Sequence, residues 1–372
     1  MRPLLLSLLI FCLPFQLGYH FWPGWSFVSG FRIDYLSPTI YFTDLIAMVY
    51  ILVCRPKLPK YLTLLFITFA LLNTNYSSSI PLTFFSWLHL SLYLVLFFSF
   101  RTEKDLIAKI QKPLLLSTVL IISIELLQFL KQSSLDGIFY FLGERPFNSA
   151  LPNIAKLDIL NHFLVRPYST FSHPNSLAGY LLILYLLLPR LRKLIILAII
   201  LTFSKAAILA LVLIQFPKRL YKPILVILLI ISLSPLIFTL VSVPFIQSSS
   251  ILSRLYSGSL ALPILQKNPI FGVGLNNYIP VLANALPTSY TFISSLQPVH
   301  SVSLLILSEL GLVGFVSAVV IIKKFLTQNS QLLILLATTA AVDHYWWTLP
   351  QNKLILVLIL ALMISKKANA KS

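Results

Sequence analysis

Runs of about 20 apolar residues recur from one end of this chain to the other, and no other feature restricts its fold as strongly. A run of that length spans the hydrocarbon core of a bilayer as one α-helix. Of the 372 residues, 58% are hydrophobic and only 10% are charged, whereas soluble domains carry about 25% charged residues. The sequence therefore predicts an all-α polytopic integral membrane protein without a separate soluble domain.

The net charge of +18 comes from lysines and arginines that stand in short clusters between the apolar runs. Such clusters orient membrane proteins, because positively charged loops stay in the cytoplasm. A nucleic-acid-binding protein would instead show a basic patch or stripe, so we expect no nucleic acid among the partners. Cys12 and Cys54 stand singly in apolar contexts without metal-ligand spacing, and we interpret them as packing residues.

The positive-inside rule holds along the whole chain only if residues 194–216 form two short helices. Lys205 follows Ser204 in the middle of this segment, and a lysine at the bilayer centre costs about 2.5–3.5 kcal/mol on insertion scales. A break at this pair predicts about twelve transmembrane elements, with both chain ends in the cytoplasm. The long loops 131–172 and 247–298 then lie outside it. One long helix with a snorkelling lysine is the alternative.

A polar stretch, RPYSTFSHPNSLAGY (166–180), interrupts the apolar runs on this outer side. Its two prolines exclude a continuous helix, and Asn175 is expected to cap the helix that follows. Arg166 and His173 then lie on irregular backbone at the outer membrane surface. Irregular backbone at this depth is tolerated only where protein or a water-filled cavity surrounds it. An ordinary loop with an N-cap is the alternative interpretation.

The second long loop carries a cation and a glycine-rich turn. Arg254 opens an apolar stretch that ends in NPIFGVGLNNY (268–278), where Gly272 and Gly274 permit tight turns and close backbone approach. The pattern lacks the third glycine and the preceding strand of a dinucleotide-binding fingerprint. We therefore expect a structural turn here and no nucleotide site.

Ionisable residues also stand near the outer ends of the last predicted helices. His300 directly precedes one helix and Glu309 lies inside it, where an ionisable residue is a functional candidate. A glutamate satisfied by a neighbouring hydroxyl is the alternative. Asp343 and His344 open the stretch DHYWWTLPQNK (343–353), whose Trp and Tyr are also typical of interfacial belts.

The chemistry available to this set is limited, because the sequence has no P-loop, nucleophile elbow, zinc-protease or kinase motif. Arginine binds phosphate oxygens bidentately, and histidine titrates near neutral pH and can take a proton from a hydroxyl. Cations and a histidine on the outer side thus favour an enzyme that acts on a phosphate-bearing lipid.

In their order, the motifs of residues 166–352 resemble the O-antigen ligase and polymerase family of bacterial envelope enzymes. The matching pieces are RPYSTFSHPNSLAGYL, TFSKAAILAL, SRLYSG with NPIFGVGLNNY, HSVSLLILSELGLVGF and DHYWWTLPQ. Residues 1–130 match only as generic transmembrane helices, and residues 131–372 would form the ligase-like catalytic region. The resemblance implies a multi-pass glycosyltransferase of the bacterial plasma (inner) membrane, with its active site facing away from the cytoplasm.

The resemblance also implies the substrates. Such enzymes take a glycan from undecaprenyl diphosphate. Ligases transfer it to a sugar hydroxyl of lipid A–core in lipopolysaccharide biosynthesis, and polymerases extend another lipid-linked glycan. We expect metal-independent transfer by direct attack with inversion at the anomeric carbon, and no cofactor. The sequence does not decide between a ligase and a polymerase. A transporter of lipid-linked sugars is the alternative from another class of protein, although no internal repeat supports it.

By this resemblance, His300 would activate the acceptor hydroxyl and Arg254 would hold the donor diphosphate. Lys205 stands where the family usually has an arginine after serine; it keeps the charge but loses the planar fork. Lys205 and Arg166 are expected to help bind the diphosphate. The residues expected to support the site are His173, Asn175, Glu309, Asp343 and His344.

Overall fold

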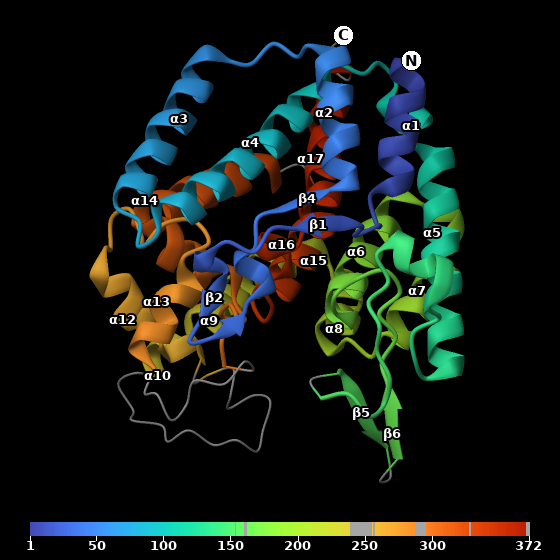
Figure 1. The fold of residues 1–372 in the computed structure, drawn as a ribbon. Helices are drawn as coiled ribbons and strands as arrows, with labels where there is room; N and C mark the ends of the chain where they lie inside the picture. The colour runs from blue at the N-terminus through green and yellow to red at the C-terminus, as the bar shows by residue number, and fades with distance from the viewer. Residues whose placement is uncertain are drawn as a thin grey trace.

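The protein is mostly helical in a computed structural model, as the sequence predicts. The structure describes residues 1–152, 154–159, 162–238, 255, 257–286, 295–326 and 329–369. The N-terminus and the last turn of helix α17 lie at one end of the molecule (Figure 1). The hairpin of β5 (Lys156–Ile159) and β6 (His162–Val165) lies at the opposite end.

Within the described residues, three helices are long and apolar enough to cross a membrane. They are α4 (Ile80–Arg101), α5 (Leu106–Lys131) and α14 (Val302–Leu326). Shorter apolar helices are α1 (Arg2–Cys12), α2 (Phe42–Cys54), α6 (Pro174–Leu187), α15 (Ser330–Ala340) and α17 (Pro350–Asn369). The remaining helices are α3 (Lys60–Asn75), α7 (Arg192–Leu201), α8 (Lys205–Leu213), α9 (Tyr221–Leu233), α10 (Pro235–Phe238), α12 (Ala261–Lys267), α13 (Tyr278–Ala285) and α16 (Tyr345–Thr348).

Many of these helices expose large apolar side chains on one side and bury them on the other. Leu65 of α3 is 68% exposed and Val320 of α14 is 61% exposed. Ile10 of α1, Leu181 of α6 and Ile355 of α17 are fully buried in one hydrophobic core. Apolar outer faces suit lipid rather than water, which agrees with a membrane protein. The same core joins the ranges 1–130 and 131–372.

The predicted break in the apolar segment 194–216 is confirmed. Helix α7 ends at Leu201 and α8 begins at Lys205. Between them Phe203 has a left-handed φ of 52°, and the Thr202 hydroxyl accepts a hydrogen bond from the Ser204 backbone N–H at 3.2 Å. The two helices contact each other and both contact α6, so Lys205 lies at a helix start instead of inside a long helix.

The glycine-rich turn packs against a break in α14. Gly311 has φ 66° and ψ −168° and interrupts that helix. Backbone hydrogen bonds cross the gap: Val273 N–H donates to Ser308 O at 2.9 Å, and Leu312 N–H donates to Pro269 O at 2.8 Å. A Cβ at Gly272 would lie 2.4 Å from the Glu309 carbonyl group. The predicted close backbone approach is therefore confirmed.

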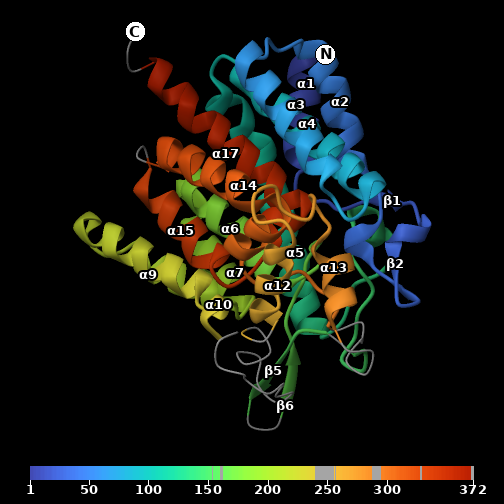
Figure 2. The ribbon, with the colours of Figure 1, turned by 90° about the vertical axis from the view of Figure 1, so that its left-hand side faces the viewer.

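Between α1 and α2 the chain forms an arm that the sequence analysis did not predict, the N-terminal arm (residues 16–41). It contains two small antiparallel sheets. Strand β1 (Gly18–His20) pairs with β4 (Thr39–Tyr41), and β2 (Phe27–Val28) pairs with β3 (Phe31–Arg32). Figure 2 shows β1 and β2 at one side of the molecule, below helices α1 to α4.

Candidate functional site

A cavity of about 760 Å³ brings together most of the ionisable residues that the sequence marks as supporting the site. His173, His300, Glu309, Asp343 and His344 all line it, although up to 171 positions of sequence separate them. The N-terminal arm, α4, the 275–279 turn, α16 and the start of α17 supply much of the remaining wall. Concave sites with a few converging polar groups are where ligands most often bind.

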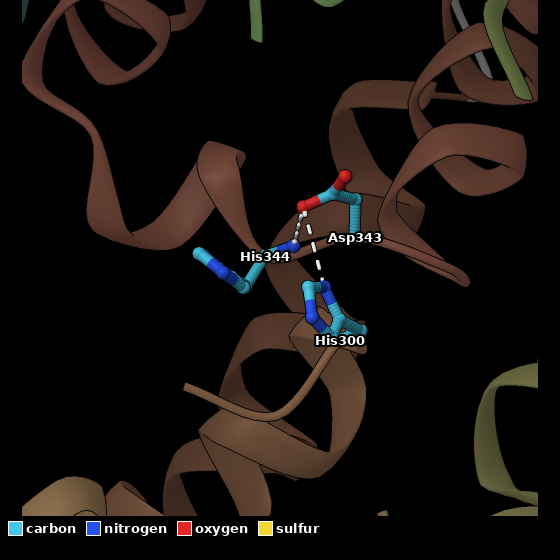
Figure 3. Close-up of side chains that lie close together, drawn as sticks. All are labelled: His300, Asp343 and His344. Carbon is cyan, nitrogen blue, oxygen red and sulfur yellow. Dashed lines mark hydrogen bonds and ion pairs between the residues drawn. The ribbon is translucent and has the colours of Figure 1, made fainter. Parts of the chain in front are cut away.

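His300 faces a buried carboxylate on the wall of this cavity. The loop before α14 holds His300, and the turn between α15 and α16 holds Asp343. His300 Nδ1 lies 3.9 Å from Asp343 Oδ1 (Figure 3). This separation exceeds a direct hydrogen bond, and catalytic hydrogen bonds are often long before substrate binds. The geometry suits a histidine base oriented by a carboxylate.

Protein donors hold the Asp343 carboxylate in place. Oδ1 accepts a hydrogen bond from the His344 backbone N–H at 2.8 Å, and Oδ2 accepts one from Asn175 Nδ2 at 2.8 Å. Burial by itself would raise the pKa of Asp343. The interaction with His300 and the charges of His344 and His173 outweigh burial and lower that pKa below its ordinary value. Asp343 is therefore ionised at neutral pH.

Arg166 lies behind this carboxylate and not on the cavity wall. Its Nη2 donates to Asn175 Oδ1 at 2.7 Å, and its Nε donates to the Thr202 carbonyl at 2.7 Å. A chain of hydrogen bonds thus runs from the end of α7 through Arg166 and Asn175 to Asp343. Arg166 lies on irregular backbone between β6 and α6, as predicted.

The capping expectation for Asn175 is wrong. Helix α6 begins at Pro174, and its N-cap is His173, whose Nδ1 accepts the Asn175 backbone N–H at 3.1 Å. The β-region backbone of His173 places its ring where it can accept that bond, while the Asn175 side chain bonds Arg166 and Asp343. Because Nδ1 accepts a hydrogen bond here, the neutral ring carries its own proton on Nε2.

The other predicted site residues do not all lie at the cavity. Arg254 lies outside the described residues. Lys205, the first residue of α8, is exposed and is not among the residues that line the cavity. Glu309 is buried just before the α14 break, and its Oε2 accepts a hydrogen bond from Trp347 Nε1 at 2.9 Å.

Three cations without a predicted role also line the cavity: Arg32, Arg145 and Lys353, which ends the stretch 343–353. Arg145 Nη1 donates to the Ser172 carbonyl at 3.2 Å, next to His173. The Arg32 guanidinium lies 4.4 Å from the Trp22 ring centroid, a cation–π distance. The topology predicted from the sequence places all three outside the cytoplasm, where the positive-inside rule leaves few lysines and arginines. That exception to the rule is the signal that could have identified them.

Three of the cavity residues could also hold a metal ion. The ligand atoms of His300, Asp343 and His344 lie within 4.8 Å of one another. The His300 and His344 rings are 5.2 Å apart between centroids, and His344 Nδ1 is 2.9 Å from Thr348 Oγ1. Sequence spacing did not reveal this group, because 43 positions separate His300 from Asp343.

Comparison with known proteins adds one finding. Residues 176–319 match the family model described as O-antigen ligase. This range contains Lys205, His300 and Glu309. No curated protein and no solved structure matches the chain.

Proposed function

We propose that the protein is a membrane glycosyltransferase of the O-antigen ligase type, whose family model residues 176–319 match, and that it transfers a glycan from undecaprenyl diphosphate to a sugar hydroxyl. The acceptor is a lipid A–core sugar or another envelope glycan. The protein lies in the bacterial plasma membrane, and its cavity opens on the face away from the cytoplasm. The apolar outer faces of the helices support the membrane location.

The observation that carries this proposal is the pairing of His300 with a buried, ionised Asp343 on the wall of a large cavity. His300 takes the proton of the acceptor hydroxyl as its oxygen attacks the anomeric carbon. The new glycosidic bond forms as the bond to the diphosphate breaks, so the anomeric centre inverts. Asp343 holds the imidazole and stabilises the imidazolium. General-base catalysis contributes about 10²–10⁴-fold to the rate.

Cations stabilise the charge that develops on the leaving diphosphate, which is commonly the largest contribution to such catalysis. We propose Arg254 and Lys205 for this role on the family resemblance. Arg145 lines the cavity itself, which supports a direct contact with the diphosphate. Arg166 donates to both Asn175 and Thr202, which supports a positioning role toward Asp343.

Transfer is proposed to need no metal. Both oxygens of Asp343 already accept hydrogen bonds from protein groups, and Arg145 and Arg32 bring positive charge to the cavity. Protein cations can therefore neutralise the diphosphate in the way that a divalent ion does in other transferases.

The test is transfer by the purified protein in detergent. An undecaprenyl-diphosphate glycan is offered with and without a lipid A–core acceptor, and His300→Ala and Arg254→Ala serve as inactive controls. Transfer that needs the acceptor establishes a ligase. Longer lipid-linked chains without it establish a polymerase that uses the same site. No turnover of any lipid-linked glycan, with stable folded protein, would contradict the proposal and favour a transporter.

A further inference from the structure

A second group of residues lines the same cavity, on helices α4, α14, α16 and α17 and, for Tyr41, at the N-cap of α2. His89 of α4, Lys353 of α17 and Glu309 of α14 line it, together with the aromatic side chains of Tyr41 and Trp347. None of the roles proposed above uses His89, Lys353 or Tyr41. We call these five residues the helical wall.

Asp44 lies directly behind the helical wall. It is 3% exposed, and its Oδ2 accepts hydrogen bonds from the Tyr41 backbone N–H at 3.0 Å and from His89 Nε2 at 3.1 Å. The first bond caps α2. Its other oxygen, Oδ1, is buried and has no hydrogen-bond partner among the described residues. Asp44 is not among the residues that line the cavity, so its carboxylate acts on the helical wall through His89, which it holds from behind.

The charges of the helical wall do not suit a diphosphate. Lys353 interacts electrostatically with both Asp44 and Glu309, so its charge is not a free surplus. A phosphate needs a surplus of cations, whereas sugar hydroxyls need both acceptors and donors. Carboxylate oxygens accept, Lys353 donates, and the rings of Tyr41 and Trp347 offer apolar faces. The helical wall has the composition of a carbohydrate site.

We propose that the helical wall binds the acceptor sugar, the one that carries the attacking hydroxyl. This inference rests on the proposed function. The cavity cations available to the donor diphosphate, Arg32 and Arg145, come from the N-terminal arm and from the 131–172 loop. The helical wall is thus left for the acceptor.

The first test separates the two substrates kinetically. Asp44→Asn keeps a capping oxygen for α2 but removes the charge that holds His89, and Lys353→Gln removes the donor cation. Loss of one hydrogen bond to a charged group is expected to raise the acceptor KM about tenfold or more, while the donor KM changes less than about twofold. The matched controls, Asp158→Asn and Lys156→Gln, lie on the β5–β6 hairpin, and both KM values should stay unchanged. A rise in the donor KM alone, or no change in either, would overturn the proposal.

The second test needs no turnover. Intrinsic tryptophan fluorescence, with Trp347 in the helical wall, reports binding of a soluble core oligosaccharide to the protein in detergent. We expect saturable binding that both Asp44→Asn and Lys353→Gln weaken and that Asp158→Asn leaves intact. Binding without transfer would keep the acceptor subsite and contradict the enzymatic proposal. No binding by the unaltered protein would overturn the subsite itself. Unchanged unfolding temperatures establish that the variants are folded.

Discussion

Asn175 Nδ2 donates a hydrogen bond to Asp343 Oδ2 at 2.8 Å across 168 positions of sequence. Through this bond the first turn of α6 holds the carboxylate that faces His300. On its other side Asn175 accepts a hydrogen bond from Arg166, so a fixed cation sets the orientation of the amide. A catalytic pair is most effective when the groups behind it hold its geometry.

Asn175→Ala should lower kcat about tenfold or more and leave both KM values nearly unchanged, because it frees the Asp343 carboxylate without touching substrate. Steady-state kinetics with donor and acceptor varied in turn would measure this. Leu187→Ala, which also removes three side-chain heavy atoms at the other end of the same helix, is the control. A variant with full kcat would show that the amide does not position Asp343.

His300→Ala should lower kcat by about 10²–10⁴-fold, and Asp343→Asn should lower it substantially as well. Because the two residues act as one unit, the double variant should be little slower than His300→Ala alone. Single-turnover transfer measures all three. Additive losses would mean that Asp343 acts independently of the histidine.

Asp343 should make the fold sensitive to acid. Its pKa in the folded protein lies below its ordinary value of about 3.9. The unfolded chain therefore takes up this proton first, and the stabilising contribution, fully present above the ordinary pKa, decreases as the pH falls below it. Between pH 5 and pH 3, the unfolding temperature should fall less steeply for Asp343→Asn than for the unaltered protein. Tryptophan fluorescence in detergent follows the unfolding, and parallel curves would contradict this account.

Gly311→Ala should destabilise the protein by at least about 1–3 kcal/mol, the usual cost of a strained backbone conformation. Gly311 has a φ of 66°, and a Cβ there would lie 2.3 Å from the Ile270 carbonyl oxygen. Gly24→Ala is the matched control, since nothing lies within 4 Å of its Cβ position. Thermal unfolding of the two variants should differ clearly, and equal stabilities would show that the break in α14 tolerates a side chain.

Treatment with a chelator, followed by removal of the chelator, should leave the transfer rate unchanged. The positive charge for the diphosphate comes from protein side chains in this mechanism. If the chelator stopped transfer and one divalent metal restored it, the group of His300, Asp343 and His344 would be a metal site. His344→Ala would then abolish the restoration.

Local chemistry made part of this structure predictable. Lys205 in an apolar segment predicted the break between α7 and α8, because its charge is costly in the membrane interior. Gly272 predicted close backbone approach, because only glycine leaves room for it. Both signals depend on a residue and its immediate neighbours.

Long-range contacts were not predictable in this way. Asn73 Nδ2 donates to the Glu309 carbonyl across 236 positions, and Asn73 Oδ1 accepts from Trp87 Nε1. Nothing near Asn73 in the sequence indicates that partner. The N-terminal arm and Arg145 reach the cavity through similar pairings, so sequence motifs alone showed only the part of the site after residue 166.

The cavity has consequences for the order in which the chain is inserted into the membrane. Its walls extend from Gln16 to Lys353, near the two ends of the sequence. Asp44 and His89 therefore enter the bilayer long before α17 emerges from the ribosome with Lys353. Until that last helix is inserted, Asp44 lacks the electrostatic interaction that Lys353 later supplies. A nascent chain is thus inactive until its last helix completes the cavity.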